Sequence, residues 1–151
     1  MSDTDTAAVK ILFVCTGNSC RSQMAEGFAR AMADETYQVS SAGTMPIGIL
    51  PETIRTMAAA GVDISGQSSK KLTEDMIRRA DYVITLCGHA RDHCPAIPSG
   101  VVHRHWEVDN PDRAYFSDEA RRQGFARVRD DIRNRIRALL AELSHRRREM
   151  S

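Results

Sequence analysis

Runs of apolar residues alternate along the chain with stretches that carry a helical repeat. The apolar runs are short, nearly continuous and rich in β-branched residues, which is typical of strands buried on both faces of a parallel sheet. The predicted strands are 9–15, 37–42, 82–87 and 101–103. Spacings of three and four residues, together with start signals such as a proline in the first turn, predict the helices. The first predicted helix begins near Ser22, and three others cover 51–60, 73–79 and 125–143.

Strands that alternate with helices indicate an α/β fold with right-handed crossovers. We therefore expect a small four-stranded parallel sheet flanked by helices. The 151 residues suffice for a single catalytic domain, 1–151. Within it, residues 1–8 are expected to form a loose leader and residues 145–151 a frayed basic tail.

Charge and hydropathy argue against nucleic acids and membranes as binding partners. The 21 Lys and Arg residues nearly balance 20 Asp and Glu, so we expect no nucleic-acid partner. Every apolar run is shorter than the roughly 20 residues that a membrane span needs, so we expect no membrane partner. The polar, acidic start of the chain does not resemble a secretory signal, which favours a cytoplasmic location. A monomer is expected, because no apolar stripe is left over once the core is filled.

Four cysteines give the first indication of chemistry. In a reducing compartment thiols stay free, which leaves catalytic, redox or metal-binding roles. Cys15 and Cys87 end the two best-defined of the predicted strands, 9–15 and 82–87. The carboxyl ends of parallel strands share one rim of a sheet, and ligands bind beyond that rim. We therefore expect both thiols at the same edge of the sheet.

The segment after Cys15 has the residue types of an anion-binding loop. Its small polar residues let backbone N–H groups converge, and the next helix adds free N–H groups and the positive end of its dipole. Arg21 can bind two oxygens of a tetrahedral anion, and the same positive field favours a nucleophilic thiolate at Cys15. Ser22 can donate a hydrogen bond to that thiolate. The alternative is a free buried cysteine beside a surface arginine. The predicted oxyanion-binding residues are Thr16, Gly17, Asn18, Ser19, Cys20 and Arg21.

The other two candidate thiols, Cys87 and Cys94, are seven positions apart. On a regular helix this separation is about 10 Å, whereas the Cα atoms of a disulfide lie within about 7 Å. A bridge therefore requires a segment that loops or unwinds, for which Gly88 supplies freedom, and such a pair suits a switch. The competing interpretation is zinc, although the spacing is unusual for it, and we expect no metal site. The ligands would then come from Cys87, His89, His93, Cys94, His103 and His105.

Several segments resemble one known family. FVCTGNSCRSQMAEG is similar to the active-site loop of the low-molecular-weight tyrosine phosphatase superfamily, and more closely to that of its thioredoxin-coupled arsenate reductases. The similarity continues in VSSAGT, GVDISGQSS, TLCGHARDHCP and HWEVDNP, in the family's order, from residue 10 to about residue 140. The resemblance implies the fold deduced above, arsenate as substrate with phosphate and sulfate as competitors, thioredoxin as partner, and no cofactor.

The resemblance also implies a relay of three thiols. Cys15 attacks arsenate and expels water or hydroxide. Cys87 attacks the sulfur of the arseno-cysteine, so that two electrons pass to arsenic, arsenite leaves, and Cys15 is bridged to Cys87. Cys94 then attacks Cys87, and thioredoxin reduces the Cys87–Cys94 disulfide. Cys20 is expected to have no catalytic role. The expected catalytic residues are Cys15, Arg21, Ser22, Cys87 and Cys94.

A set of residues around the loop is expected to stabilise it. In family members, the positions that match Asn18, Glu26 and Ser41 stabilise the loop and, in some of them, bind a potassium ion. The carboxylate that completes that potassium site matches Lys70 in this chain. A lysine ammonium among these oxygens can stand in for the cation. The alternative is equally weighted: Lys70 is a surface residue and Glu26 a helix-surface acid.

The family usually has an aspartate directly before the proline of a later loop, where it acts as general acid. This chain has Asn110 before Pro111, and an amide cannot deliver a proton. We favour departure of the arsenate oxygen without an acid, with Asn110 donating a hydrogen bond. Asp109 is the next candidate for the acid, and Asp112 is the third.

Two other functions remain as alternatives. A low-molecular-weight phosphotyrosine phosphatase needs Cys15, Arg21 and an acid, but leaves Cys87 and Cys94 without a role. Such a phosphatase is also expected to carry an aromatic residue after Pro111, and this chain has none there. A non-catalytic oxyanion sensor would not need the two additional thiols either.

Overall fold

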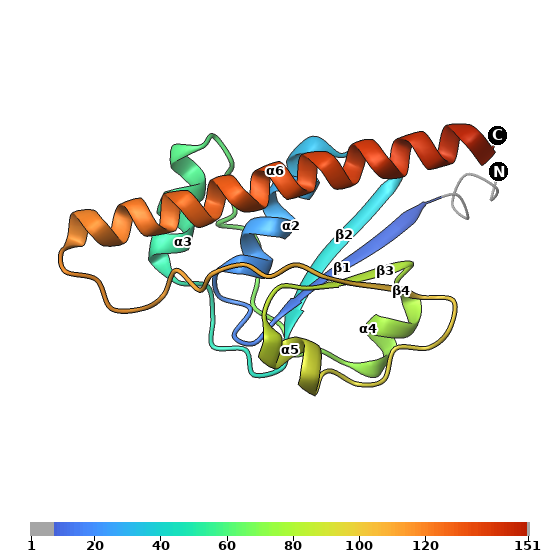
Figure 1. Cartoon of the computed structure of the whole chain (residues 1–151), viewed down its shortest axis with the longest axis horizontal. Helices are drawn as coiled ribbons and strands as arrows, with labels where there is room; N and C mark the ends of the chain where they lie inside the picture. The colour runs from blue at the N-terminus through green and yellow to red at the C-terminus, as the bar shows by residue number, and fades with distance from the viewer. Residues whose placement is uncertain (1–7, 151) are drawn as a thin grey trace.

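The computed structural model describes residues 8–150 and shows one sheet in which all strand pairs are parallel (Figure 1). Of the predicted leader, residues 1–7 lie outside the described part of the chain. The strand order is β2-β1-β3-β4. The strands are β1 (Val9–Cys15), β2 (Tyr37–Gly43), β3 (Tyr82–Thr85) and β4 (Val102–His105). The predicted four-stranded parallel sheet is therefore confirmed.

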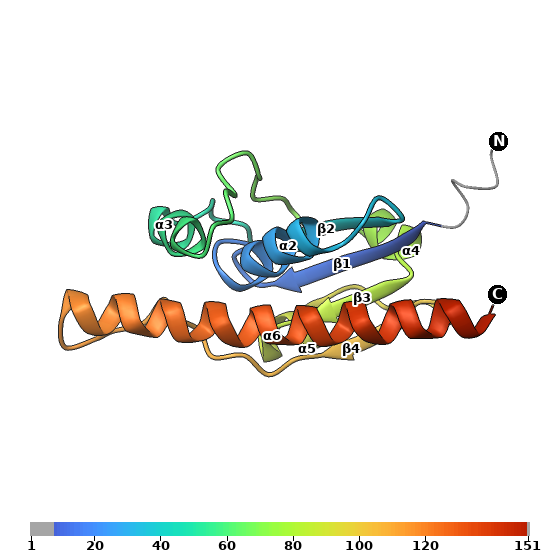
Figure 2. The same cartoon turned by 90° about the horizontal axis from the view of Figure 1, so that it is seen from above.

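Helices cover both faces of this sheet. Figures 1 and 2 show α6 running the length of the molecule beside α2, on the face opposite to α4 and α5. The long helix also packs against α3, which lies beyond the end of the sheet. The helices are α2 (Arg21–Met32), α3 (Pro51–Ala59), α4 (Glu74–Arg79), α5 (Gly88–His93) and α6 (Asp118–Met150).

The core follows the predicted pattern. Phe13 and Val14 of β1 are completely buried between the two helical layers. Burying a side chain of this kind contributes roughly 1.5–3 kcal/mol relative to leaving it exposed. The apolar stripe of α6 also lies in the core, as its spacing predicts. Its buried residues are Phe125, Val128, Ile132, Ile136, Leu139 and Leu143.

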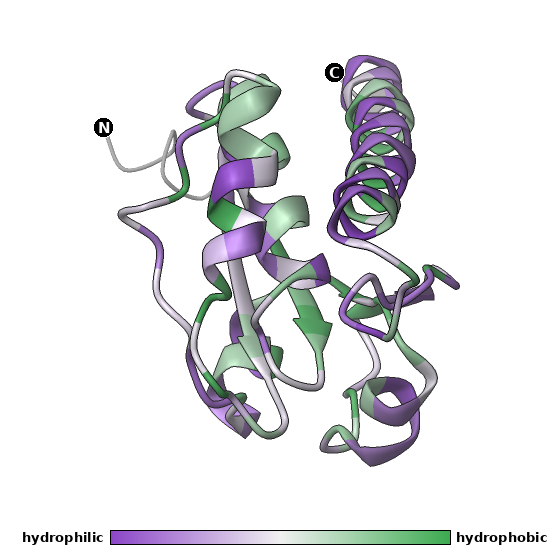
Figure 3. Ribbon diagram, turned by 90° about the vertical axis from the view of Figure 1, so that its left-hand side faces the viewer, coloured by the Kyte–Doolittle hydropathy of each residue, from purple (hydrophilic) through white to green (hydrophobic). Residues whose placement is uncertain are grey.

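Two helices differ from the prediction. α6 begins at Asp118, where the Ser117 hydroxyl accepts a hydrogen bond from the N–H of Ala120 at 3.0 Å, before any apolar repeat is visible. It also continues through 145–150, where we expected a frayed tail. Seen nearly end-on in Figure 3, α6 mixes hydrophilic and hydrophobic residues. The second difference is α5, a helix that was not predicted, in the segment that would have to loop or unwind for a Cys87–Cys94 bridge.

The sheet brings the carboxyl ends of β1 and β2 side by side, with Cys15 paired to Gly43. A Cβ atom on Gly43 would lie 2.5 Å from the carbonyl oxygen of Thr16 and 2.9 Å from the backbone nitrogen of Asn18. Only glycine therefore lets the loop after β1 fold back over the end of β2. This close approach positions the loop that carries the predicted oxyanion site.

In residues 8–150, no helix combines the length and the apolar character needed to cross a lipid bilayer.

Candidate active site

Cys15 is the last residue of β1, and the loop that follows it leads directly into α2. Cys20 is the N-cap of this helix, and no side chain caps its first turn. The free N–H groups of the helix start therefore remain available for an anion, together with the positive end of the helix dipole. Cys15 itself is buried, with 3% of its surface exposed. The expected placement of Cys15 at a junction of strand, loop and helix is thus present.

Hydrogen bonds around Ser22 have a defined direction. The Asn18 amide nitrogen Nδ2 donates to Ser22 Oγ at 2.7 Å. The Ser22 hydroxyl hydrogen is then free to point at Cys15 Sγ, which lies 2.8 Å from Ser22 Oγ. A donor at this position stabilises negative charge on sulfur when Cys15 acts as nucleophile and when it leaves.

Asn18 holds the loop in its turn. Its φ of 48° lies in the left-handed region, which asparagine tolerates better than most residues. Its side chain is completely buried and fully paired. Oδ1 accepts from the backbone N–H of Lys70 at 2.8 Å, and Nδ2 donates to Ser22 and to Ser41 Oγ at 3.0 Å. The loop is therefore fixed from the inside of the protein, away from the anion site.

The hydrogen bonds continue from Ser41 to Glu26, another buried residue. Ser41 Oγ donates to Glu26 Oε1 at 2.6 Å, and Arg30 forms an ion pair with Glu26 Oε2. The ammonium of Lys70 lies 4.0 Å from Glu26 Oε1 and donates to the Ser68 carbonyl at 2.9 Å. The four predicted loop-stabilising residues are thus brought together, and Lys70 places a fixed positive charge among their oxygens.

The guanidinium of Arg21 is held at the mouth of the loop. Its Nη1 donates to the carbonyl oxygens of Leu86 and Val108, at 3.3 and 3.0 Å. These contacts tie Arg21 to the segments that follow β3 and β4. A bound tetrahedral anion can replace them with charged oxygens, which form stronger hydrogen bonds with arginine.

Cys87 lies beside the loop, as its position after β3 predicts. Thr16 Oγ1 lies 3.2 Å from Cys87 Sγ, and the backbone N–H of Ala90 donates to the same sulfur at 3.4 Å. Cys87 is also the N-cap of α5 and is 7% exposed. Cys87 therefore contacts the side chain of the residue that directly follows Cys15 in the chain.

Cys94 caps the other end of α5. It is partly exposed, and burial raises the pKa of its thiol above the usual value. The intervening residues are helical, so the two cysteines are separated by about 10 Å along the helix axis. Both are free thiols. A Cys87–Cys94 bridge would therefore require α5 to unwind.

Cys20 is buried within the loop. Burial raises the pKa of its thiol, and the negative charge of Asp112 adds to the rise. A thiol that stays protonated is a poor nucleophile. This agrees with the absence of a catalytic role for Cys20.

One pocket opens over the loop. Asn110 and Asp112 line it together with Cys15, whereas Asp109 lines a separate hollow against α6, which Asn110 also borders. Of the two aspartates considered as general acids, Asp112 lines this pocket and Asp109 does not. The residues that line the pocket are Cys15, Thr16, Gly17, Ser19, Cys20, Arg21, Met45, Ile47, Asn110 and Asp112.

Met45 and Ile47 were not predicted as pocket residues. They are 56% and 69% exposed and follow β2, whose carboxyl end adjoins that of β1. The neighbouring strand end was a signal that could have located them. They make the rim of the pocket apolar.

The histidines considered as zinc ligands contact other protein groups. Both His103 Nε2 and His105 Nδ1 lie within hydrogen-bonding distance of the buried Thr85 hydroxyl, at 3.1 and 2.8 Å. The rings of His89 and His93 stack on one another along α5. Among the residues that the structure describes, no three His, Cys, Asp or Glu side chains form a group that could hold a metal ion.

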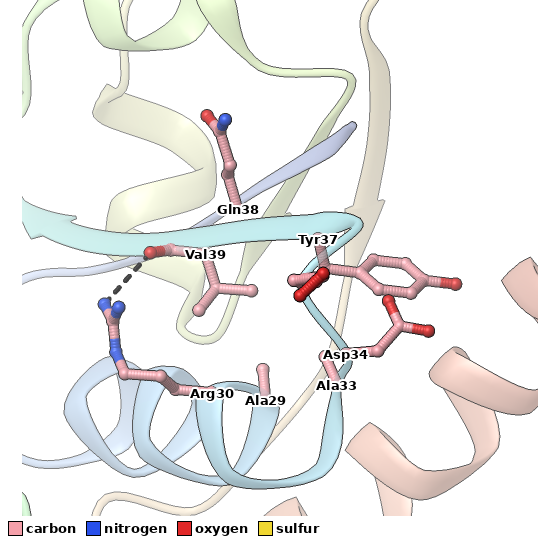
Figure 4. Close-up of a pocket in the computed structure, with 8 residues that line it drawn as sticks. Ala29, Arg30, Ala33, Asp34, Tyr37, Gln38 and Val39 are labelled. Carbon is pink, nitrogen blue, oxygen red and sulfur yellow. Dashed lines mark hydrogen bonds between the residues drawn. The ribbon is translucent and has the colours of Figure 1, made fainter. Parts of the chain in front are cut away.

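A second hollow lies at the opposite end of the sheet, where α2 ends and β2 begins (Figure 4). Arg30 and Asp34 line it, and the Arg30 guanidinium donates to the Val39 carbonyl at 3.1 Å. No cysteine lines this hollow. The pocket over the Cys15 loop is therefore the candidate active site.

The sequence matches the family model described as low molecular weight phosphotyrosine protein phosphatase over residues 10–149. It is also 46% identical over 127 residues to a protein from Halalkalibacterium halodurans named arsenate reductase, with 84% of this chain and 91% of that protein covered.

The solved structures that resemble this one include an arsenate reductase and a tyrosine phosphatase. The thioredoxin-dependent arsenate reductase of Corynebacterium glutamicum superposes with a TM-score of 0.75 at 30% identity, covering 95% of this chain and 67% of that one. A low molecular weight protein tyrosine phosphatase from T. tengcongensis gives a TM-score of 0.77 at 24% identity, covering 89% and 99%. The second likeness establishes the shared fold.

Proposed function

Because the chain belongs to the low-molecular-weight phosphotyrosine protein phosphatase family, we propose that it uses this phosphatase-type site to reduce arsenate to arsenite, with thioredoxin as electron donor. The observation that carries the proposal is the second buried thiol beside the loop, with Cys87 Sγ 3.2 Å from Thr16 Oγ1 and Cys94 at the far end of α5. A phosphatase has no use for these two thiols. The names of the relatives given above support the same activity.

The first step forms a bond between sulfur and arsenic. Arsenate binds to the N–H groups of the loop and to Arg21, and the Cys15 thiolate attacks the arsenic atom. One arsenic–oxygen bond breaks, and the oxygen leaves as water or hydroxide. Arsenic stays in its +5 state in this step. The negative charge of the oxyanion is held by fixed donors, which is the main source of rate acceleration in such sites.

The second step reduces arsenic. The Cys87 thiolate attacks Sγ of Cys15, a disulfide forms, and the sulfur–arsenic bond breaks with both electrons remaining on arsenic. Arsenite leaves in the +3 state. Thr16 and the N–H of Ala90, both within hydrogen-bonding distance of Cys87 Sγ, stabilise the attacking thiolate.

The last steps return the enzyme to its starting state. Cys94 attacks Cys87, which releases Cys15 as a thiolate and leaves a Cys87–Cys94 disulfide. Thioredoxin then reduces this disulfide by thiol–disulfide exchange. The product is arsenite, so the expected role is arsenic detoxification. Weak phosphatase activity is also expected, since phosphate is close to arsenate in shape and charge.

The test is a comparison of two activities of the purified protein. We expect arsenate to drive oxidation of NADPH when thioredoxin and thioredoxin reductase are supplied, at a much higher kcat/KM than the hydrolysis of an aryl phosphate. Efficient hydrolysis without arsenate-dependent oxidation would assign a phosphatase instead. If neither activity occurs while phosphate still binds, the protein is an oxyanion sensor.

We further propose that Lys70 takes the place of a potassium ion. Its ammonium lies among the oxygens of Glu26 and Ser68, and a second cation there would be repelled. The melting temperature and reduction rate of the wild-type protein are therefore expected to be the same in potassium chloride and in tetramethylammonium chloride of equal ionic strength. Lys70→Asp is expected to gain stability from potassium, at about 2–4 °C per kcal/mol of binding free energy.

Lys71 provides a matched control for this experiment. Its ammonium donates to the Thr44 carbonyl at 2.6 Å, outside the Glu26 group, so Lys71→Gln should remain insensitive to potassium. A marked rise in melting temperature of the wild-type protein in potassium would contradict the proposal.

A further inference from the structure

We propose that Asp112, held by Arg121 of α6, relays the proton to the oxygen that leaves arsenate. This inference rests on the proposed function and assigns an acid to a site whose usual position holds Asn110. It starts from the placement of three neighbouring residues. Asp112 lines the pocket over Cys15, Asp109 lines a separate hollow against α6 with Arg127, and Asn110 borders both.

The turn between Asn110 and Asp112 explains this placement. The backbone N–H of Asp112 donates to Asn110 Oδ1 at 3.0 Å, which closes a tight turn around Pro111. The side-chain oxygen Oδ1 of Asn110 thereby accepts a hydrogen bond, and the NH₂ group of the same amide can act as a donor. Asn110 can orient an oxyanion but cannot transfer a proton to it.

Arg121 fixes the direction of the Asp112 carboxylate. Its Nη2 lies 3.1 Å from Asp112 Oδ1, and its Nη1 donates to the Arg113 carbonyl at 3.4 Å. The guanidinium also stacks over the Phe125 ring, with 4.8 Å between Cζ and the ring centroid. The ion pair with Arg121 engages Oδ1 of Asp112, and we assign the proton transfer to its other oxygen, Oδ2, because the residue lines the pocket.

A second anchor holds the same loop. Tyr115 packs against α6 at Gly124, where an added Cβ would lie 2.2 Å from Tyr115 Oη and 2.5 Å from its Cζ. The Arg113 guanidinium lies over the ring of Tyr115, with its Cζ 4.6 Å from the ring centroid. Because Gly124 has no side chain, Tyr115 can pack directly against α6. This contact fixes the position of the loop that contains Asp112.

The loop also lies close to the reacting groups. The charge of Asp112 reaches into the Cys15 loop, since it contributes to the raised pKa of Cys20. Arg21, Cys15 and Asp112 line one pocket, so an anion bound to the loop has Asp112 on its open side. The leaving oxygen of an in-line displacement points away from the attacking Cys15 sulfur, toward that open side.

The chemistry requires one proton and no further reactant. The substrate monoanion, H₂AsO₄⁻, passes a proton to Asp112 Oδ2 as it binds. Cys15 attacks arsenic, the bond to the leaving oxygen breaks, and Asp112 returns the proton to that oxygen, which departs as water. The sum is H₂AsO₄⁻ + Cys15–S⁻ → Cys15–S–AsO₃²⁻ + H₂O. Asp112 ends as a carboxylate, which Arg121 stabilises.

Asp112→Asn tests the relay, because the amide keeps the size of the side chain and an oxygen for Arg121 but cannot accept the proton. We expect single-turnover formation of arsenite, with enzyme in excess over labelled arsenate, to slow by about 100-fold or more. Inhibition by inorganic phosphate, which reports binding, should change by less than about threefold, because the step lost is chemical. A merely structural role would weaken phosphate binding as well.

Two further variants make the test decisive. Asp109→Asn makes the same change in the separate hollow against α6 and should alter the rate by less than about threefold. Adding Asn110→Asp to Asp112→Asn returns a carboxyl group to the same pocket and should recover at least about tenfold of the rate. This recovery also shows that the Asp112→Asn protein is folded.

The relay is wrong if Asp112→Asn forms arsenite within about threefold of the wild-type rate, or if Asp109→Asn loses as much. A wild-type protein that forms no arsenite at all contradicts the proposed function itself. The two failures are therefore distinguishable.

Discussion

Replacing Cys15 with serine is expected to lower arsenate-dependent thioredoxin oxidation by at least about 10⁴-fold, the scale of loss that follows removal of a catalytic nucleophile. The residue lies at the end of β1 with its sulfur 2.8 Å from Ser22 Oγ. A serine hydroxyl at this place is protonated at neutral pH, and it cannot form the disulfide by which Cys87 releases arsenite. Both the first and the second step are therefore lost.

The measurement is the steady-state rate, together with phosphate binding to show that the loop is intact. Cys20→Ser is the matched control, because Cys20 lies in the same loop and is also buried. We expect this variant to keep most of its activity, since a serine there retains Ser19 and Thr53 as polar neighbours. Substantial arsenite production by Cys15→Ser would contradict the assignment of the nucleophile.

Replacing Cys94 with serine is expected to stop the reaction after a single turnover. Arsenite can still form, because its release depends on Cys15 and Cys87 alone. The enzyme then remains with Cys15 bridged to Cys87, since no thiol follows to open that bond. The substitution should leave the fold unchanged, as Cys94 is only partly buried and its Sγ makes a weak contact, 3.9 Å from the Arg91 carbonyl.

Mass mapping of disulfides after one equivalent of arsenate reports the trapped state. We expect one arsenite per enzyme and a Cys15–Cys87 bridge in Cys94→Ser, and a Cys87–Cys94 bridge in the wild-type protein without thioredoxin. Repeated turnover of Cys94→Ser with thioredoxin present would show that Cys94 does not complete the relay.

The sheet was predictable because its information is local. β1 and β3 are nearly continuous apolar runs, and the apolar stripe from Phe125 to Leu143 predicts α6. β4 is an edge strand with the sequence VHRH, and its polar residues hide its full extent. α5 was missed for a related reason: in GHARDH only Ala90 is buried, so no apolar repeat marks the helix.

The candidate site also has a part that the sequence predicts and a part that it does not. The Cys15 loop and the two further thiols follow from short motifs at strand ends. The choice between Asp109 and Asp112 does not, because both lie in one polar segment next to Pro111. The proposed choice of Asp112 rests on Arg121 and Gly124, which lie on a helix further along the chain. Contacts between distant segments of this kind leave no pattern in the sequence.

The helical state of α5 has a consequence for the energetics of the proposed disulfide. Cys87 and Cys94 cap a helix when they are thiols, and they can join only when that helix is unwound. The folding free energy of six residues is therefore part of the reduction potential of the bridge. Each 1.4 kcal/mol by which the helix stabilises the dithiol raises this potential by about 30 mV. In the proposed cycle, the helix that opposes formation of the bridge would therefore make its reduction by thioredoxin more favourable.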